Sequence, residues 1–269
     1  ELDLVFSFDL AQAYINAART ARAQDAANLL QRDLKIFSAS GAAPYAQFAS
    51  FLTNHDQART MSMMADDVQK AKLAASLLLT TPGVPFIYYG EEIGMLGIKP
   101  DELIRTPMQW SPEANGGFTS ATPWEALNDD YANKNAYAQL KDPASLLSHY
   151  RALIHLRNAH VALRTGEYLP VQACAPTVLA FLRISSQPAE AVLVVINLDA
   201  DALPNCSFTL TEGPLTGAYQ PAVMLDTAQV DSPPASLSLN TLGGFDAYQP
   251  YPSLAAYQTL LLQLQSSDK

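Results

Sequence analysis

Basic residues are scarce in this chain. It has 16 Lys and Arg side chains against 26 Asp and Glu, which gives a formal net charge of −10 at pH 7. After Pro170 the only basic side chains are Arg183 and Lys269. Because nucleic-acid binding needs clustered Lys and Arg to displace phosphate counterions, the composition predicts no nucleic-acid partner. A neutral ligand such as a sugar fits an acidic surface, although net charge mainly reflects solubility.

Long apolar runs are also lacking. The richest, residues 73–79, is soon followed by Thr80, Thr81, Pro82 and Gly83. A membrane helix needs about 20 predominantly apolar residues, so we predict no membrane partner. The first residues have neither the basic leader nor the small-residue cleavage site of a signal peptide. The compartment stays open between secreted and cytoplasmic.

Cysteine is rare, with only Cys174 and Cys206 present. The two can pair only in an oxidising compartment and only if their geometry allows it. We expect two buried free thiols instead. Zinc needs more ligands at closer spacing, and none of the four histidines lies near the cysteines in sequence. We therefore predict no metal site in this chain.

The first 165 residues alternate short apolar runs with helical stretches, as β/α units around a parallel sheet do. The predicted strands are residues 2–8, 48–53 and 84–89. One helix passes through Asp25 and Phe37 and ends near Ser40. The next opens at Asp66 and Asp67, whose charges suit the positive end of the helix dipole, and ends before Pro82-Gly83.

A loop of unusual length, residues 90–135, follows the third strand, and such loops tend to carry function. Asp142-Pro143 then predicts the start of a last helix, with Leu146, Tyr150, Leu153 and Ile154 on its apolar face. Beyond Gly166, apolar runs alternate with Pro, Asn, Asp and Gly turns, which is typical of an antiparallel β-sandwich. We predict two domains, 1–165 and 166–269. The strand-like runs of the second are residues 177–184, 191–196 and 207–210.

Three polar residues, Asn54, His55 and Asp56, directly follow the second predicted strand. The carboxyl ends of barrel strands carry the active site, where a carboxylate can stabilise a cationic transition state or hold sugar hydroxyls. From the tripeptide alone, a simple helix-capping role is an equal alternative. Glu91 and Glu92 follow the third strand and offer a second pair of carboxylates.

The Asn-His-Asp segment resembles the fourth short motif of the α-amylase family, glycoside hydrolase family 13. Later segments resemble that family in the right order, at 83–95, 105–110, 116–119, 123–124 and 153–157. The resemblance implies the last three β/α units of a (β/α)8 TIM barrel followed by the family's C-terminal β-sandwich.

The resemblance also implies roles for single residues. Asp56 matches the third catalytic carboxylate, which grips the sugar at the cleavage site, and His55 matches a histidine that hydrogen-bonds the same sugar. Asn54 and Arg59 complete the predicted substrate-binding set, although their positions favour support of the loop. Glu91 and Glu92 match structural residues in the family.

Five further residues, two tryptophans and three histidines, need an interpretation. Trp110 and Trp124 can stack on sugar rings at the cleft rim, but we expect them to pack the long loop. The three other histidines have no carboxylate or cysteine near them in sequence, and we expect ordinary surface or packing roles for His149, His155 and His160.

A retaining glycosidase also needs a nucleophilic carboxylate and an acid/base carboxylate. Neither motif is found here, so the resemblance implies that both come from outside this chain, from the N-terminal remainder of the same protein. We therefore expect the isolated chain to be inactive, in a parent enzyme that cleaves α-1,4 bonds in starch-like glucans or maltooligosaccharides. An exo-acting α-glucosidase, a glucosyl transferase and a non-catalytic sugar-binding module remain alternatives. A structural calcium ion, frequent in the family, is expected elsewhere in the parent enzyme.

Overall fold

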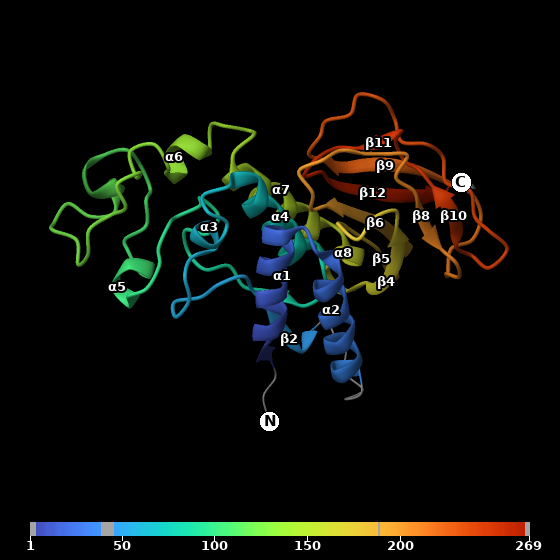
Figure 1. The fold of residues 1–269 in the computed structure, drawn as a ribbon, viewed down its shortest axis with the longest axis horizontal. Helices are drawn as coiled ribbons and strands as arrows, with labels where there is room; N and C mark the ends of the chain where they lie inside the picture. The colour runs from blue at the N-terminus through green and yellow to red at the C-terminus, as the bar shows by residue number, and fades with distance from the viewer. Residues whose placement is uncertain (1–3, 39–45, 188, 267–269) are drawn as a thin grey trace.

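The structure is a computed structural model, which describes residues 4–38, 46–187 and 189–266. Figure 1 shows helices and a long loop at the left and centre, and an antiparallel sheet at the right. No helix in the described ranges is long and apolar enough to cross a membrane.

Three short strands form a parallel sheet in the order β1-β2-β3. They are β1 (Val5–Phe6), β2 (Phe48–Ser50) and β3 (Val84–Pro85). All three fall inside the predicted segments but are shorter, and Leu2 lies outside the described residues. Three strands cannot close a barrel, so this sheet is open at both edges in the described residues.

The helices of this region pack against one another and against neighbouring strands of both sheets. They are α1 (Phe8–Thr20), α2 (Ala23–Ser38), α3 (Thr60–Met63), α4 (Val68–Thr80), α7 (Leu146–Ala159) and α8 (Val161–Thr165). The sequence predicted α2 and missed α1, which buries Leu10, Tyr14 and Ile15. The predicted end of α2 near Ser40 lies outside the described residues.

Two predictions about helix starts differ in outcome. Asp67 caps α4, because its Oδ1 accepts the backbone N–H groups of Gln69 and Lys70. The prediction that Asp142-Pro143 opens α7 is wrong. Ser145 is the cap, and its Oγ accepts the N–H of Ser148. Asp142 instead accepts the N–H of Ala144 and turns the chain just before the helix.

The long loop between β3 and α7 holds only short helices. These are α5 (Asp101–Ile104), a 3₁₀ turn η2 (Ala114–Gly117) and α6 (Ala136–Gln139). It extends away from the C-terminal sheet at the left of Figure 1. Its base is fixed by Gln139, whose side chain donates to the carbonyl of Ile93 and accepts from the N–H of Leu147.

The C-terminal region is one antiparallel sheet of seven strands in the order β10-β8-β4-β5-β6-β12-β9. The strands are β4 (Glu167–Ala173), β5 (Val178–Ser186), β6 (Ala189–Asn197), β8 (Phe208–Leu210), β9 (Tyr219–Asp226), β10 (Phe245–Tyr248) and β12 (Thr259–Ser266). A separate pair joins β7 (Leu203–Pro204) to β11 (Ser253–Leu254).

This sheet curls over at β4, and the predicted β-sandwich stays a prediction. Residues 167–171 of β4 pair with β5, whereas Gln172 and Ala173 pair with β8, so β4 forms the corner. Phe208 of β8 and Phe245 of β10 therefore share a core with Leu182 and Leu193 of the central strands. The antiparallel strands were predicted correctly, but the curl depends on pairing that no local pattern specifies.

Alternate residues of the central strands face two different cores. Phe181 and Val194 pack with helices α1 and α4, whereas Leu182 and Leu193 belong to the second core. Period-two alternation sends neighbours to opposite faces, and burial on both faces explains the nearly continuous apolar runs. One core thus contains residues from both predicted domains. The boundary near residue 165 stays a prediction.

The two cysteines form a disulfide, so the prediction of free thiols is wrong. Cys174 follows β4 and Cys206 precedes β8, and pairing of these two strands brings their Cα atoms to 5.1 Å. That distance lies within the range a disulfide spans. Sequence spacing alone carried no sign of this contact.

Candidate active site

The Asn54-His55-Asp56 turn follows β2 at the edge of an aromatic hollow of about 350 Å³. The exits of all three parallel strands contribute to it. The lining residues are Phe6, Phe8, Phe51, Thr53, Asn54, His55, Asp56, Phe86, Ile87 and Tyr88. An apolar hollow with a few polar groups on one side is a usual form of a ligand site.

The turn holds its own backbone in place. The N–H of Asp56 donates to Asn54 Oδ1 at 2.9 Å, which is an Asx turn. The His55 and Asp56 side chains are 65% and 61% exposed, so both are open to a ligand. Asn54 therefore supports the turn, as its position in the family motif suggested, and adds one polar side chain to the hollow.

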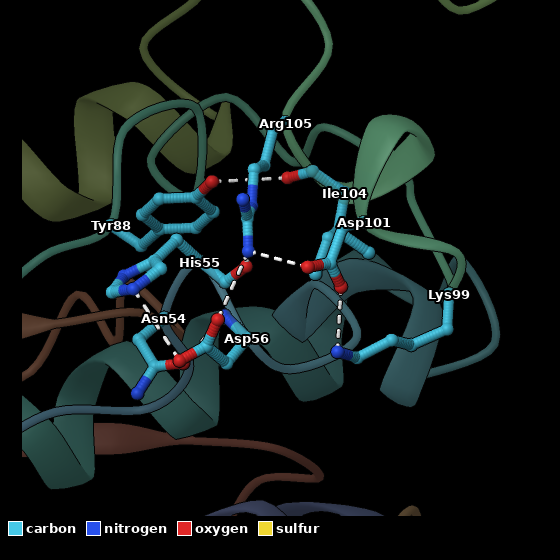
Figure 2. Close-up of polar contacts among 8 residues, drawn as sticks. All are labelled: Asn54, His55, Asp56, Tyr88, Lys99, Asp101, Ile104 and Arg105. Atoms are coloured by element: carbon cyan, nitrogen blue, oxygen red, sulfur yellow. Dashed lines mark hydrogen bonds and ion pairs between the residues drawn. The ribbon is translucent and has the colours of Figure 1, made fainter.

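The Asp56 carboxylate has a charged partner that the sequence did not identify as a site residue. Arg105 Nη2 lies 3.0 Å from Asp56 Oδ1, and His55 Nε2 lies 3.4 Å from Asp56 Oδ2 (Figure 2). Arg105 Nε also donates to the carbonyl of His55 at 2.9 Å. One guanidinium from the long loop thus contacts both residues predicted to bind the sugar.

Arg105 is itself held by a neighbouring acid. Its Nη2 lies 2.7 Å from Asp101 Oδ2, and Lys99 Nζ lies 2.6 Å from Asp101 Oδ1 (Figure 2). The hydrogen bond from Lys99 lowers the pKa of Asp101. Asp101 therefore stays ionised and keeps Arg105 in place beside Asp56. The Arg105 segment carried the family resemblance, but no local rule indicated that it returns to a turn 49 residues earlier.

Arg59 lies beneath the turn and is only 1% exposed. Its Nη1 donates to the carbonyl of Tyr89 at 2.6 Å, and its guanidinium lies against the rings of Tyr88 and Tyr89. Burial lowers the pKa of Arg59. This position fits support of the loop better than contact with a sugar.

Glu91 is buried and faces away from the hollow. Its Oε1 accepts from Tyr150 Oη at 2.8 Å and its Oε2 accepts from Thr60 Oγ1 at 2.9 Å. Burial raises the pKa of Glu91 to about 7. These partners join α3 and α7, as a structural residue would. Burial also raises the pKa of Glu92, whose carboxylate does not line the hollow.

The remaining candidates lie apart from the hollow. Trp110 and Trp124 are 53% and 60% exposed, which contradicts the expectation that they pack the long loop. His149 is buried, with Nε2 near Ser76 Oγ and the carbonyl of Lys72, and burial lowers its pKa to about 4. His160 contacts Glu190. In the described part of the chain, no three His, Cys, Asp or Glu side chains gather as a metal site would require.

A family model described as "Alpha amylase, catalytic domain" matches residues 1–166, more than half of the sequence. The chain belongs to the α-amylase family. Its fold agrees over nearly its whole length with a crystal structure of an alpha-amylase from H. orenii. The TM-score is 0.75 at 30% identity, and the match covers 98% of this chain and 49% of that one.

Curated proteins similar to this α-amylase-family chain have different activities in their names. An oligo-1,6-glucosidase of Halalkalibacterium halodurans is 34% identical over 55% of this chain and 33% of its own length. Alpha-amylase 3 of Dictyoglomus thermophilum is 32% identical over 72% of this chain and 38% of its own. The chain thus spans between a third and a half of the length of these three proteins. These matches show a family of carbohydrate-active proteins. They do not identify the bond that is cleaved, because the names of the relatives differ in activity.

Proposed function

We propose that Asp56 serves as the third catalytic carboxylate of a retaining glycosidase that cleaves α-1,4 bonds in starch-like glucans, with His55 holding the same sugar. The proposal depends chiefly on one observation, that an exposed carboxylate and an exposed imidazole lie side by side at the rim of the strand-end hollow. The proposal extends to an endo-acting amylase, since alpha-amylases are among the similar proteins of known sequence and structure.

The geometry supports different roles for Asp56 and His55. Asp56 accepts hydrogen bonds from sugar hydroxyls, and such bonds strengthen as the ring distorts toward an oxocarbenium-like transition state. His55 donates to the same sugar, while the aromatic side chains of the hollow cover its apolar face. Bond making and breaking need two further carboxylates, which we propose belong to the N-terminal remainder of the same protein.

The direct test uses a protein that contains this chain together with that remainder. Asp56→Asn keeps the shape of the side chain but removes its charge, and we expect kcat on amylose to fall at least about 100-fold. Glu113→Gln, in the long loop outside the hollow, is the matched control. Cleavage that survives Asp56→Asn undiminished would disprove the assigned role.

Two further measurements define the reaction. Maltooligosaccharide products of mixed length indicate endo action, whereas glucose alone indicates an α-glucosidase. A purified chain of residues 1–269 should release no reducing sugar from amylose. Release of sugar that Asp56→Ala abolishes would show that the chain carries a complete site. Binding of maltooligosaccharides without cleavage by the longer protein would favour a sugar-binding module.

A further inference from the structure

The two carbonyl groups on either side of Arg105 are held by consecutive tyrosines. Tyr88 Oη donates to the carbonyl of Ile104 at 3.1 Å, and Tyr89 Oη donates to the carbonyl of Thr106 at 2.7 Å. We call Tyr88 and Tyr89 the tyrosine clamp. Burial raises the pKa of Tyr88 to about 12, so its hydroxyl keeps its proton at neutral pH and donates. The exit of strand β3 therefore fixes the main chain before and after Arg105.

The tyrosine clamp rests on Arg59. The guanidinium carbon of Arg59 lies 4.7 Å from the ring centre of Tyr88 and 4.6 Å from that of Tyr89. A cation held against two aromatic rings is attracted by both. The backbone N–H of Arg59 also donates to the carbonyl of Gly97 at 2.9 Å, which fixes the start of the segment that leads to Arg105. Arg59 thus holds the rings of Tyr88 and Tyr89 in place.

The contacts close into a ring because Arg59 follows Asp56 by only three residues in the sequence. Arg105, at the far side of the ring, returns to Asp56 Oδ1 and to the carbonyl of His55. Asp56 is 61% exposed, and its carboxylate contacts Arg105 through Oδ1 and His55 through Oδ2. Figure 2 shows Arg105 reaching down from the loop between Asp101 and Asp56.

We propose that Arg105, held by the tyrosine clamp over Arg59, fixes the side-chain rotamer of Asp56. Arg105 touches the carboxylate directly, and the other three act through it as positioning residues. Fixing a carboxylate before the substrate arrives removes an ordering cost from the reaction. The catalytic consequence rests on the proposed function, but the effect on the Asp56 rotamer does not.

The rotamer can be measured in the isolated chain by NMR. Three-bond couplings to the Asp56 carboxyl carbon report whether the side chain occupies one rotamer. We expect the couplings of one dominant Asp56 rotamer in the unaltered chain. In Arg105→Gln we expect couplings averaged over several rotamers. Arg151→Gln removes the same charge from an exposed position of α7 outside the hollow, so its couplings should match the unaltered chain. Unchanged couplings in Arg105→Gln, or equal averaging in both variants, would overturn the proposal.

The indirect members are tested by removing two hydroxyl groups only. The double variant Tyr88→Phe/Tyr89→Phe keeps both rings over Arg59, and we expect the same averaging of Asp56. Tyr248→Phe is the control, because its hydroxyl also donates to a carbonyl, that of Ala235, in the C-terminal region. If the double variant fails to fold, Tyr89→Phe alone carries the test. A folded variant with one fixed Asp56 rotamer would exclude the tyrosine clamp from the path.

Kinetics in the longer active protein separate positioning from simple structural support. Arg105→Gln should lower kcat roughly tenfold or more with a smaller change in KM, and Arg105→Lys should recover part of the loss. A structural role would lower the yield of folded protein instead. If Asp56→Asn leaves cleavage intact while Arg105→Gln frees the rotamer, the proposed function fails and the positioning path stands.

Discussion

The parallel sheet and the C-terminal sheet of this chain differ in how far their apolar side chains are buried. At the parallel sheet, Phe6 of β1 and Phe86, which directly follows β3, are 45% and 42% exposed beside the candidate site. In the C-terminal sheet, Phe181 and Val194 are fully buried between the sheet and the helices. Both regions have similar residue types in their strands, so the difference lies in the partners available. Strands with cover on both faces form a stable core, whereas strands with one covered face leave a surface for ligand or further chain.

The largest expected effect sharpens this comparison with a matched pair of phenylalanines. Phe181→Ala removes a fully buried ring from the core shared by β5 and the helices, and it should cost about 3–5 kcal/mol of unfolding free energy. Phe86→Ala at the open sheet should cost far less. Urea unfolding of both variants measures the contrast, and equal losses would show that the open face is covered in solution.

Removing the disulfide tests how far the C-terminal region depends on closure. Cys174→Ser/Cys206→Ser frees a loop with a sequence separation of 32 residues, and about 2–4 kcal/mol should be lost. The couplings of Asp56 should not change, since the bridge joins β4 to the segment before β8, away from the turn. Thermal unfolding with and without a reducing agent gives the stability. A change at Asp56 would mean that the two regions are more tightly coupled than their contacts indicate.

A pH titration of stability tests the buried acid of the first region, Glu91. The pKa of Glu91 is about 7 in the folded chain and about 4.5 unfolded, so the folded state binds the extra proton between these values. Its contribution to stability is fully present below pH 4.5 and falls as pH rises to 7, by at most about 3 kcal/mol.

Glu91→Gln should therefore remove this slope when its urea midpoint is compared with that of the unaltered chain from pH 4.5 to 7.5. The buried His149 acts in the opposite direction, because its pKa is lowered to about 4 in the folded chain. Its contribution to stability is therefore lost as the pH decreases from 6.5 to 4. His149→Gln separates the two contributions. If Glu91→Gln shows the same pH slope as the unaltered chain, Glu91 is not the source.

The smallest expected effect concerns the helix that lies between the two regions. Asp67→Ala removes the two hydrogen bonds that cap α4 and should cost about 1 kcal/mol. Asp25→Ala removes an exposed acid from the first turn of α2 and should cost less, because only the dipole interaction is lost. Chemical unfolding measures both variants. Equal costs would show that charge matters at α4 and that the cap hydrogen bonds do not.

The buried arginines show why such a helix depends on tertiary contacts. Arg183 of β5 donates to the carbonyl of Thr80, and Arg157 of α7 donates to the carbonyls of Leu79, Thr81 and Gly83. Both side chains satisfy groups at the carboxyl end of α4, where a helix leaves carbonyls without partners. In the sequence Arg183 stood out only as a rare basic residue.

The sequence by itself determined the elements whose signal is local. The Asp67 cap, the three parallel strands, the central antiparallel strands and the Asn-His-Asp turn were all readable within a few residues. These features follow from backbone preferences and from the period of apolar residues, which act over one or two turns of chain. The family resemblance rested on the same short segments.

Only the tertiary structure decided the contacts between distant segments. It paired Cys174 with Cys206, curled the C-terminal sheet at β4, exposed Trp110 and Trp124, and brought Arg105 to Asp56. Each of these depends on which surfaces meet once the elements pack, and no local preference records that choice. The turn that bears the candidate carboxylate could be found from its neighbours in sequence, whereas the arginine beside it became visible only in the fold.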